Sequence, residues 1–252
     1  MKTRVRLLAV GVSLFTAHAA AQTVLFDFDS APPRAPLPIR LTIGGITAQF
    51  SATGQGFSIQ EANTLGFTPT GFAGYCVYPG SVFAADLLVA FSRPLTSFSI
   101  LYAPEEYACD SSARMRVTAD LDGLVVGTST TTADPPGTWP SATLAFSSAQ
   151  TFNHVVIHYD APPPTGGDWG PIFMSDNMTV VSPPTLRIAL ADPYTAVLAW
   201  AAAATGFTLQ QSADPAPGSW SNVTNTVNTV GDENQVIVAL SPGGRFYRLS
   251  QP

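Results

Sequence analysis

Two acidic segments far apart in the chain carry carboxylates where a β-strand normally has none. Asp27 and Asp29 lie in VLFDFD, and Asp176 precedes Asn177 in FMSDNMTVV. Both segments alternate apolar with polar residues, as half-buried strands do. If the two strands are neighbours in one sheet, their oxygens come close enough to hold a hard cation. We therefore expect a hard cation between Asp27 or Asp29 of one strand and Asp176 with Asn177 of the other.

A second set of carboxylates suggests hydrolysis. Glu105 and Glu106 lie in PEEYACD, and Asp168 lies in GGDWG. Glycoside hydrolysis requires a carboxylate pair, and these three residues are the candidates if the protein is an enzyme. However, adjacent glutamates usually point apart, and surface loops also collect acids for solubility. We therefore assign no catalytic residue.

His154 and His158 are the histidines that remain after export, so a Ser-His-Asp mechanism would have to use one of them. They share one face of an expected strand, about 13 Å apart, which is too far for both to bind one metal ion. The sequence contains no G-x-S-x-G motif. Both residues are therefore expected to be surface-strand histidines.

Aromatic residues in expected loops point to a glycan site. Sugars stack their C–H faces on exposed rings while neighbouring polar groups bind the hydroxyls. Burial in the core is the alternative for each ring. The ligand-binding candidates are Trp169, Trp139 and Tyr107, with Asp168 and Arg114 as polar partners; Tyr75, Tyr78 and Arg93 have the same character, although a surface salt bridge is the alternative for each arginine.

Cys76 and Cys109 are the two cysteines of the chain. In an exported protein a disulfide is the default interpretation of such a pair. A bridge closing a loop of this length would stabilise the fold by roughly 3 to 4 kcal/mol. A metal-binding or nucleophilic thiol is the less favoured alternative, because neither cysteine has a C-x-x-C partner or a nearby histidine.

Residues 1–21 have the form of a secretory signal peptide, with a basic start, a short apolar run and small residues before Gln22. The apolar run is too short to span a membrane. We expect a mature chain that is secreted, periplasmic or on the cell surface, without membrane insertion.

The mature composition excludes several functions. Removing the signal peptide leaves eight arginines, no lysine and 17 acidic residues, a formal net charge of −9. Nucleic acid is a poor partner for such a surface, and lysine chemistry is excluded. Few charges with abundant Gly, Pro, Ser and Thr favour many short strands joined by turns.

The strand pattern predicts an all-β protein of two domains. Ser182-Pro183-Pro184 marks the boundary between a β-sandwich domain at residues 22–182 and a smaller one at residues 185–252. The larger domain has expected strands at residues 24–29, 39–52, 56–60, 87–91, 97–102, 115–121, 124–131, 142–146, 154–159 and 172–181.

The larger region resembles the jelly-roll domains of exported bacterial proteins, including those associated with PEP-CTERM sorting, which are akin to carbohydrate-binding modules. The resemblance covers roughly residues 23–181 and rests on FDFD, VAFSRPLTSFSILY, DLDG and SDNMTV. It implies a structural calcium between the first and last strands, bound by Asp29 and Asp176, with Asp27 as a further candidate ligand. The sequence departs from the sorting-signal proteins because it lacks a terminal Pro-Glu-Pro, an apolar span and a basic tail.

The smaller region resembles an immunoglobulin-like, fibronectin type III module. The phrases AVLAW, TGFTLQQS, GSWSNV and RFYRL carry this resemblance, which makes Trp200 and Tyr247 core residues.

The pattern as a whole favours a non-catalytic protein that binds a glycan, such as a cell-surface polysaccharide, or another surface ligand. No organic cofactor is expected. Two alternatives remain: a glycoside hydrolase that uses the loop carboxylates, and a purely structural envelope or matrix protein.

Overall fold

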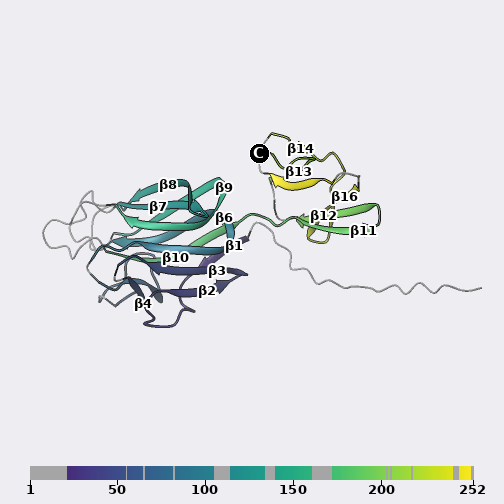
Figure 1. Cartoon of the computed structure of the whole chain (residues 1–252). Coiled ribbons are helices and arrows are strands. Elements are labelled where there is room, and N and C mark those ends of the chain that lie inside the picture. The colour runs from purple at the N-terminus through teal and green to yellow at the C-terminus, as the bar shows by residue number, and fades with distance from the viewer. Residues whose placement is uncertain are drawn as a thin grey trace, which may run out of the picture. The chain divides into compact units, whose positions relative to one another are not determined.

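The computed structural model describes residues 22–250, except 55, 65, 82, 105–113, 134–139, 161–171, 203, 205, 217 and 241–243. The regular elements in this described part of the chain are all β-strands, and all their pairings are antiparallel (Figure 1). The all-β class predicted from the composition is confirmed. No helix among these residues is long and apolar enough to cross a membrane.

The chain divides into two compact units, Ala21–Pro184 and Thr185–Ser250. The strands of the first unit are β1 (Gln22–Phe26), β2 (Ile39–Ile43), β3 (Ile46–Ala52), β4 (Phe57–Glu61), β5 (Tyr75–Pro79), β6 (Leu87–Pro104), β7 (Arg114–Leu121), β8 (Leu124–Thr132), β9 (Ala142–Tyr159) and β10 (Phe173–Ser182).

Two long strands, β6 and β9, run through both layers of the first unit. The first half of β6 lies between β3 and β9, and its second half lies between β10 and β9. Register shifts interrupt the β6–β9 pairing near the middle of both strands. Because of these shifts, the buried positions of β6 change from odd numbers, such as Val89, to even numbers, such as Phe98. One continuous pair of strands thus folds into two layers.

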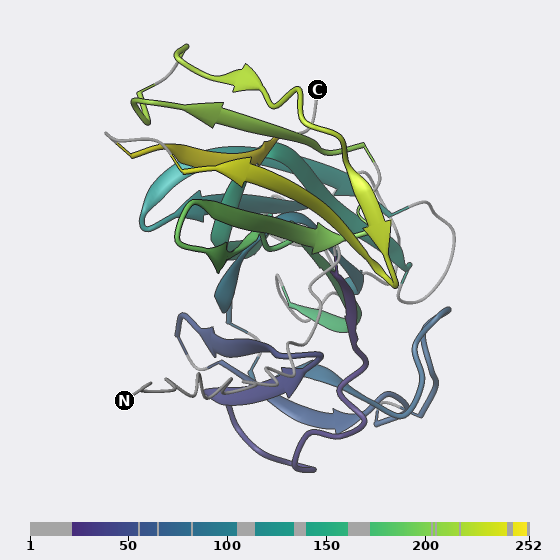
Figure 2. The ribbon, with the colours of Figure 1, turned by 90° about the vertical axis from the view of Figure 1, so that its right-hand side faces the viewer.

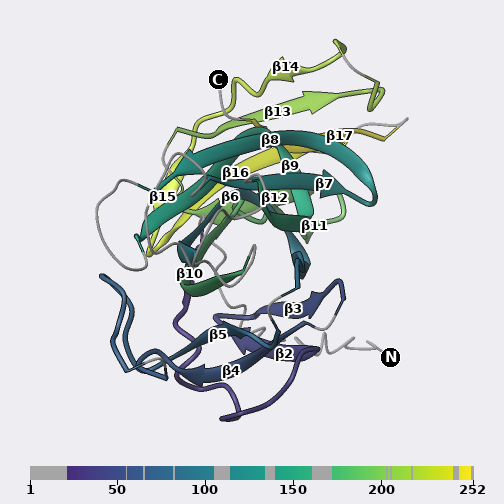
Figure 3. The ribbon, with the colours of Figure 1, turned by 90° about the vertical axis from the view of Figure 1, so that its left-hand side faces the viewer.

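The two layers enclose one hydrophobic core, which makes the unit a β-sandwich. Side chains from β3 and β7, such as Phe50 and Val117, share this core with Phe26 of β1 and Phe173 of β10. Figure 3 shows β2 to β5 on one side of the unit and β7 and β8 on the other, and Figure 2 shows the molecule from the opposite side.

The first and last strands of this unit are neighbours, as their acidic residues predicted. β1 pairs with β10 from Gln22 opposite Ser182 to Phe26 opposite Met178. Beyond this ladder, Phe28 and Asn177 have positive φ angles of 60° and 48°. Phe28 follows the end of β1, and Asn177 lies inside β10, where the pairing with β6 shifts register between Asp176 and Thr179.

The second unit contains two sheets. Its strands are β11 (Arg187–Asp192), β12 (Thr195–Ala201), β13 (Thr208–Ser212), β14 (Ser221–Asn222), β15 (Asn228–Val230), β16 (Glu233–Ala239) and β17 (Phe246–Ser250). The four-stranded sheet has the order β11-β12-β16-β15, and the three-stranded sheet has the order β14-β13-β17. Trp200 is buried between Leu198, Leu209 and Val236, with Tyr247 packed against them. Both rings are core residues, as predicted.

If the two units fold independently, a chain that ends after Pro184 should unfold at the same temperature as the first unit does in the full-length protein. Differential scanning calorimetry of both chains measures this. Loss of the cooperative transition on truncation would instead show that residues 185–252 are part of one folding unit.

Candidate functional site

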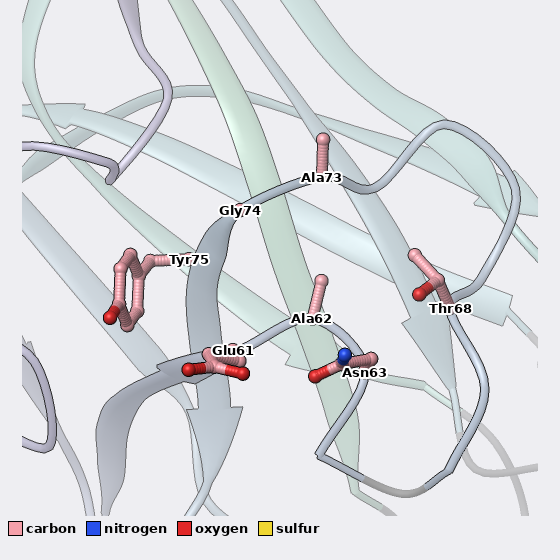
Figure 4. A pocket seen from close by; sticks show the side chains of 7 residues that line it. All are labelled: Glu61, Ala62, Asn63, Thr68, Ala73, Gly74 and Tyr75. Atoms are coloured by element: carbon pink, nitrogen blue, oxygen red, sulfur yellow. The ribbon is translucent and has the colours of Figure 1, made fainter.

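The loop of residues 62–74, between β4 and β5, forms one wall of a polar groove (Figure 4). Two adjoining cavities, of about 270 and 460 Å³, share Glu61, Asn63 and Tyr75 in their walls. The described residues that complete the walls are Ala62, Thr68, Ala73 and Gly74 in the first cavity, and Pro33, Arg34, Gln60 and Thr64 in the second.

The groove combines one aromatic ring with both kinds of hydrogen-bonding group. Tyr75 begins β5, and its ring is half-buried, so one part packs against the core while the rest faces the groove. Arg34 supplies a cation, Glu61 an anion, and Asn63 an amide; all three are exposed. Figure 4 shows Tyr75 beside Glu61, with Asn63 next along the groove.

The segment before β2 forms the other wall and is held by backbone hydrogen bonds to β4. The Arg34 amide donates to the Ile59 carbonyl at 2.8 Å, and the Ile59 amide donates to the Ala35 carbonyl at 2.9 Å. Arg34 has a φ of 61°, an uncommon conformation for a residue with a side chain. These hydrogen bonds therefore hold the backbone of Arg34, and with it the start of its side chain, in one position beside the groove.

The aspartates predicted as metal ligands bind the backbone of the groove loop. Asp29 Oδ1 accepts a hydrogen bond from the Tyr75 amide at 2.8 Å. Asp176 Oδ2 accepts one from the Ala73 amide at 3.1 Å. Asn177 Nδ2 donates to the Gly71 carbonyl at 3.1 Å. The segment after β1 and the register shift within β10 thus hold residues 71–75 in place.

Gly74 is required for this close approach. A Cβ atom at this position would clash with the carboxylate of Asp29, and Gly74 has a φ of 54°. Any other residue here would push the loop away from Asp29.

Asp176 is a buried carboxyl group with only 1% of its surface exposed. Burial raises its pKa to about 6; the hydrogen bonds from the Ala73 and Asn177 amides oppose this rise, and the charges of Asp29 and Asp27 add to it. The three aspartates therefore lie close enough to interact, as the sequence suggested. A proton on Asp176 relieves their mutual repulsion.

The described residues contain no group of three His, Cys, Asp or Glu side chains arranged to hold a metal ion. Asp27 Oδ1 accepts a hydrogen bond from the Asp29 amide at 3.2 Å, so each aspartate of the set already has a backbone donor. The calcium ion stays a prediction, with Asp27, Asp29 and Asp176 as its ligands.

Cys76 is a fully buried free thiol that interacts electrostatically with Asp176. Burial, together with that charge, raises the thiol pKa to about 12, which makes Cys76 a poor nucleophile. The predicted bridge is not formed at Cys76 in this structure, and Cys109 lies outside the described residues. The pairing stays a prediction.

Both histidines lie on β9 and bind aspartates on its outer face. His154 Nδ1 is 2.6 Å from Asp120 Oδ2, and His158 Nδ1 is 2.6 Å from Asp86 Oδ1. The prediction of surface-strand histidines is confirmed. Arg114, a candidate ligand residue, forms a salt bridge with Asp160 at 3.3 Å and does not line the groove.

Six of the predicted site residues lie outside the described residues: Glu105, Glu106, Tyr107, Trp139, Asp168 and Trp169. Conversely, the sequence did not indicate that Arg34, Glu61 and Asn63 share a groove with Tyr75, because they come from separate segments. Tyr75 was recognisable as an aromatic residue beside polar ones, but its position in β5 was not.

No family model matches the chain, and no curated protein matches its sequence. Among solved structures, it is similar to the K2 cleaved adhesin domain of Lys-gingipain, with 13% identity, coverage of 63% of this chain and 97% of that one, and a TM-score of 0.38. The K1 domain from Porphyromonas gingivalis W83 has 16% identity, coverage of 63% and 97%, and a TM-score of 0.29. The tandem CBM22 domains of Xyn10C from Paenibacillus barcinonensis have 9% identity, coverage of 94% and 92%, and a TM-score of 0.31. At such TM-scores these likenesses carry no argument.

The raised pKa of Asp176 predicts that this residue makes the protein less stable at neutral pH. The carboxyl group binds its proton more tightly in the folded state. Its contribution to the free energy of unfolding is therefore complete below the ordinary pKa of 3.8 and is lost as the pH rises through about 6. Between about pH 4 and pH 7, the free energy of unfolding of the wild type should fall by roughly 2 to 3 kcal/mol relative to that of Asp176→Asn. Urea unfolding of both proteins in chelator measures the difference. Parallel pH profiles would contradict the assignment.

Calcium would reverse this behaviour, because a bound cation favours the ionised carboxylate. If the predicted ion binds, added calcium should raise the melting temperature of wild type by mass action and should leave Asp176→Asn unchanged. A wild-type melting temperature that responds neither to chelator nor to calcium would eliminate the ion.

Proposed function

We propose that the first unit of this protein binds carbohydrate in the groove around Tyr75. The observation that carries the proposal is that one half-exposed aromatic ring lies beside a mixed set of hydrogen-bond donors and acceptors, next to a loop that Asp29 and Asp176 hold by hydrogen bonds. A cavity of about 460 Å³ has the size of a small-ligand site.

Each groove residue has a distinct part in recognising a sugar. The Tyr75 ring offers a flat apolar surface to the C–H face of a pyranose. Arg34 donates hydrogen bonds, Glu61 accepts them, and Asn63 does both. A sugar hydroxyl is itself both donor and acceptor, so a mixed lining fits a polyhydroxylated ligand better than it fits an apolar or a singly charged one.

The hydrogen bonds that hold the loop in place also favour binding. Tyr75 and Ala73 are held through their backbone amides by Asp29 and Asp176, and the Ala62 amide donates to the Gly74 carbonyl at 2.8 Å. A groove that is already ordered loses little conformational entropy when a ligand binds. This is the property expected of a binding module.

Hydrolysis is the second candidate, but the groove itself favours it less. Glycoside hydrolysis needs two carboxylates across the scissile bond, and Glu61 is the one carboxylate among the described lining residues. An enzyme would therefore have to use Glu105, Glu106 or Asp168.

The proposal is tested by screening the mature chain on a glycan array and then titrating the best glycan by calorimetry. Tyr75→Ala should weaken binding by about 1 to 3 kcal/mol, as loss of an aromatic anchor does. Tyr75→Phe keeps the ring and should bind almost as wild type does.

Tyr194→Ala provides the matched control, because Tyr194 is 78% exposed and lines neither cavity. If Tyr75→Ala and Tyr194→Ala bind like wild type, the Tyr75 groove is not the site. Turnover of a chromogenic glycoside that Glu105→Gln, Glu106→Gln or Asp168→Asn abolishes would favour the hydrolase instead.

A further inference from the structure

We propose a second binding site, on the outer face of the three-stranded sheet of the second unit, for the carboxylate groups of an acidic saccharide. The site is a row of three polar side chains across the sheet, Asn222 of β14, Gln210 of β13 and Arg248 of β17. Gln210 is directly opposite both Asn222 and Arg248 in the strand register. β13 and β14 are labelled in Figure 1, and all three strands in Figure 3.

The row lies on the face that points away from the core. The neighbouring positions Leu209 and Leu249, which are also opposite each other, pack into the core of the unit. Since successive residues of a strand point to opposite faces, Gln210 and Arg248 point outward. Arg248 and Asn222 are exposed.

A hydrogen-bond relay fixes the direction of every group in the row. Arg248 Nε donates to Gln210 Oε1 at 2.9 Å, and Gln210 Nε2 donates to Asn222 Oδ1 at 3.1 Å. Arginine can only donate, so the oxygen of Gln210 must face Arg248 and its amino group must face Asn222. The relay therefore engages the oxygens of both amides.

Most of the groups left over are donors. The relay uses only Nε of Arg248 and one lone pair on each amide oxygen. Both Nη groups of Arg248 and Nδ2 of Asn222 make no hydrogen bond with the described residues. These donors and the positive charge of Arg248 favour an acceptor-rich, anionic ligand, and a guanidinium fork matches a carboxylate through two parallel hydrogen bonds.

Trp220 lies against this fork. The centre of the Arg248 guanidinium lies 4.3 Å from the centroid of the Trp220 ring, a cation–π contact. The described residues provide no carboxylate partner for Arg248. An indole beside an anion-binding fork suits a sugar that carries a carboxylate, because the pyranose ring can contact the aromatic edge.

The distribution of charge allows an anion to approach this unit. From residue 185 onward the sequence has three arginines and four acidic residues, whereas residues 22–184 have five arginines and 13 acidic residues. Most of the negative charge therefore belongs to the first unit. Repulsion from more distant exposed charges is largely screened at physiological salt.

The test uses the mature full-length chain, with trigalacturonate as the probe and its methyl ester as the uncharged control. Titration is followed by Trp fluorescence and calorimetry. Trigalacturonate should bind and the methyl ester should not. Asn222→Asp replaces the outward donor by a carboxylate without changing the size of the side chain, and it should weaken binding about tenfold or more. Arg248→Lys keeps the charge but loses the fork, and it should weaken binding to a similar extent.

Arg245→Gln is the matched control for Asn222→Asp, because it lowers the net charge of the unit by the same amount at a position outside the row. Equal binding of acid and ester, no effect of Asn222→Asp in a folded protein, or an equal effect of Arg245→Gln would each overturn the proposal. Tyr75→Ala should leave trigalacturonate binding unchanged, so the experiment tests this site separately from the proposed carbohydrate groove of the first unit.

Discussion

The groove of the first unit depends on carboxylates that accept hydrogen bonds from the backbone amides of a loop. Asp29 follows β1, Asp176 lies within β10, and each binds one amide of residues 71–75. A loop of this length has many backbone donors that need partners, and a buried donor without one is costly. The carboxylates satisfy two of them and fix the position of Tyr75. The raised pKa of Asp176 is the physical cost of burying this carboxyl group, and the charges of Asp29 and Asp27 add to that cost.

The outline of the fold was predictable because it follows from local patterns. Alternating side chains identified most strands, and the unusual aspartates identified β1 and β10 as neighbours, since only adjacent strands would bring those groups together. β5 was missed because its sequence, YCVYP, buries Cys76 and Val77 on opposite faces and so shows no alternation. β6 was expected as two strands because the register shift near Pro94 changes the buried face.

The site was less predictable because it depends on contacts distant in sequence. β1 and β10 were correctly expected to be neighbours, but no local pattern showed that the backbone of residues 71–75 would lie against Asp29 and Asp176. Arg34, Glu61 and Tyr75 come from three segments whose proximity is set by the pairing of residues 34–37 with β4. The row of Asn222, Gln210 and Arg248 likewise becomes visible only when the strand register is known.

The two bent strands, β6 and β9, have a mechanical consequence. Most sandwiches join separate strands in their two layers by loops, and such layers can slide or hinge at those loops. Here each of two adjacent strands belongs to both layers, so the layers are connected through covalent backbone, and β6 pairs with β9 on both sides of the register shifts. A displacement of one layer must bend these two strands. The groove and the outer face of β9, which carries His154 and His158, therefore belong to one stiff body.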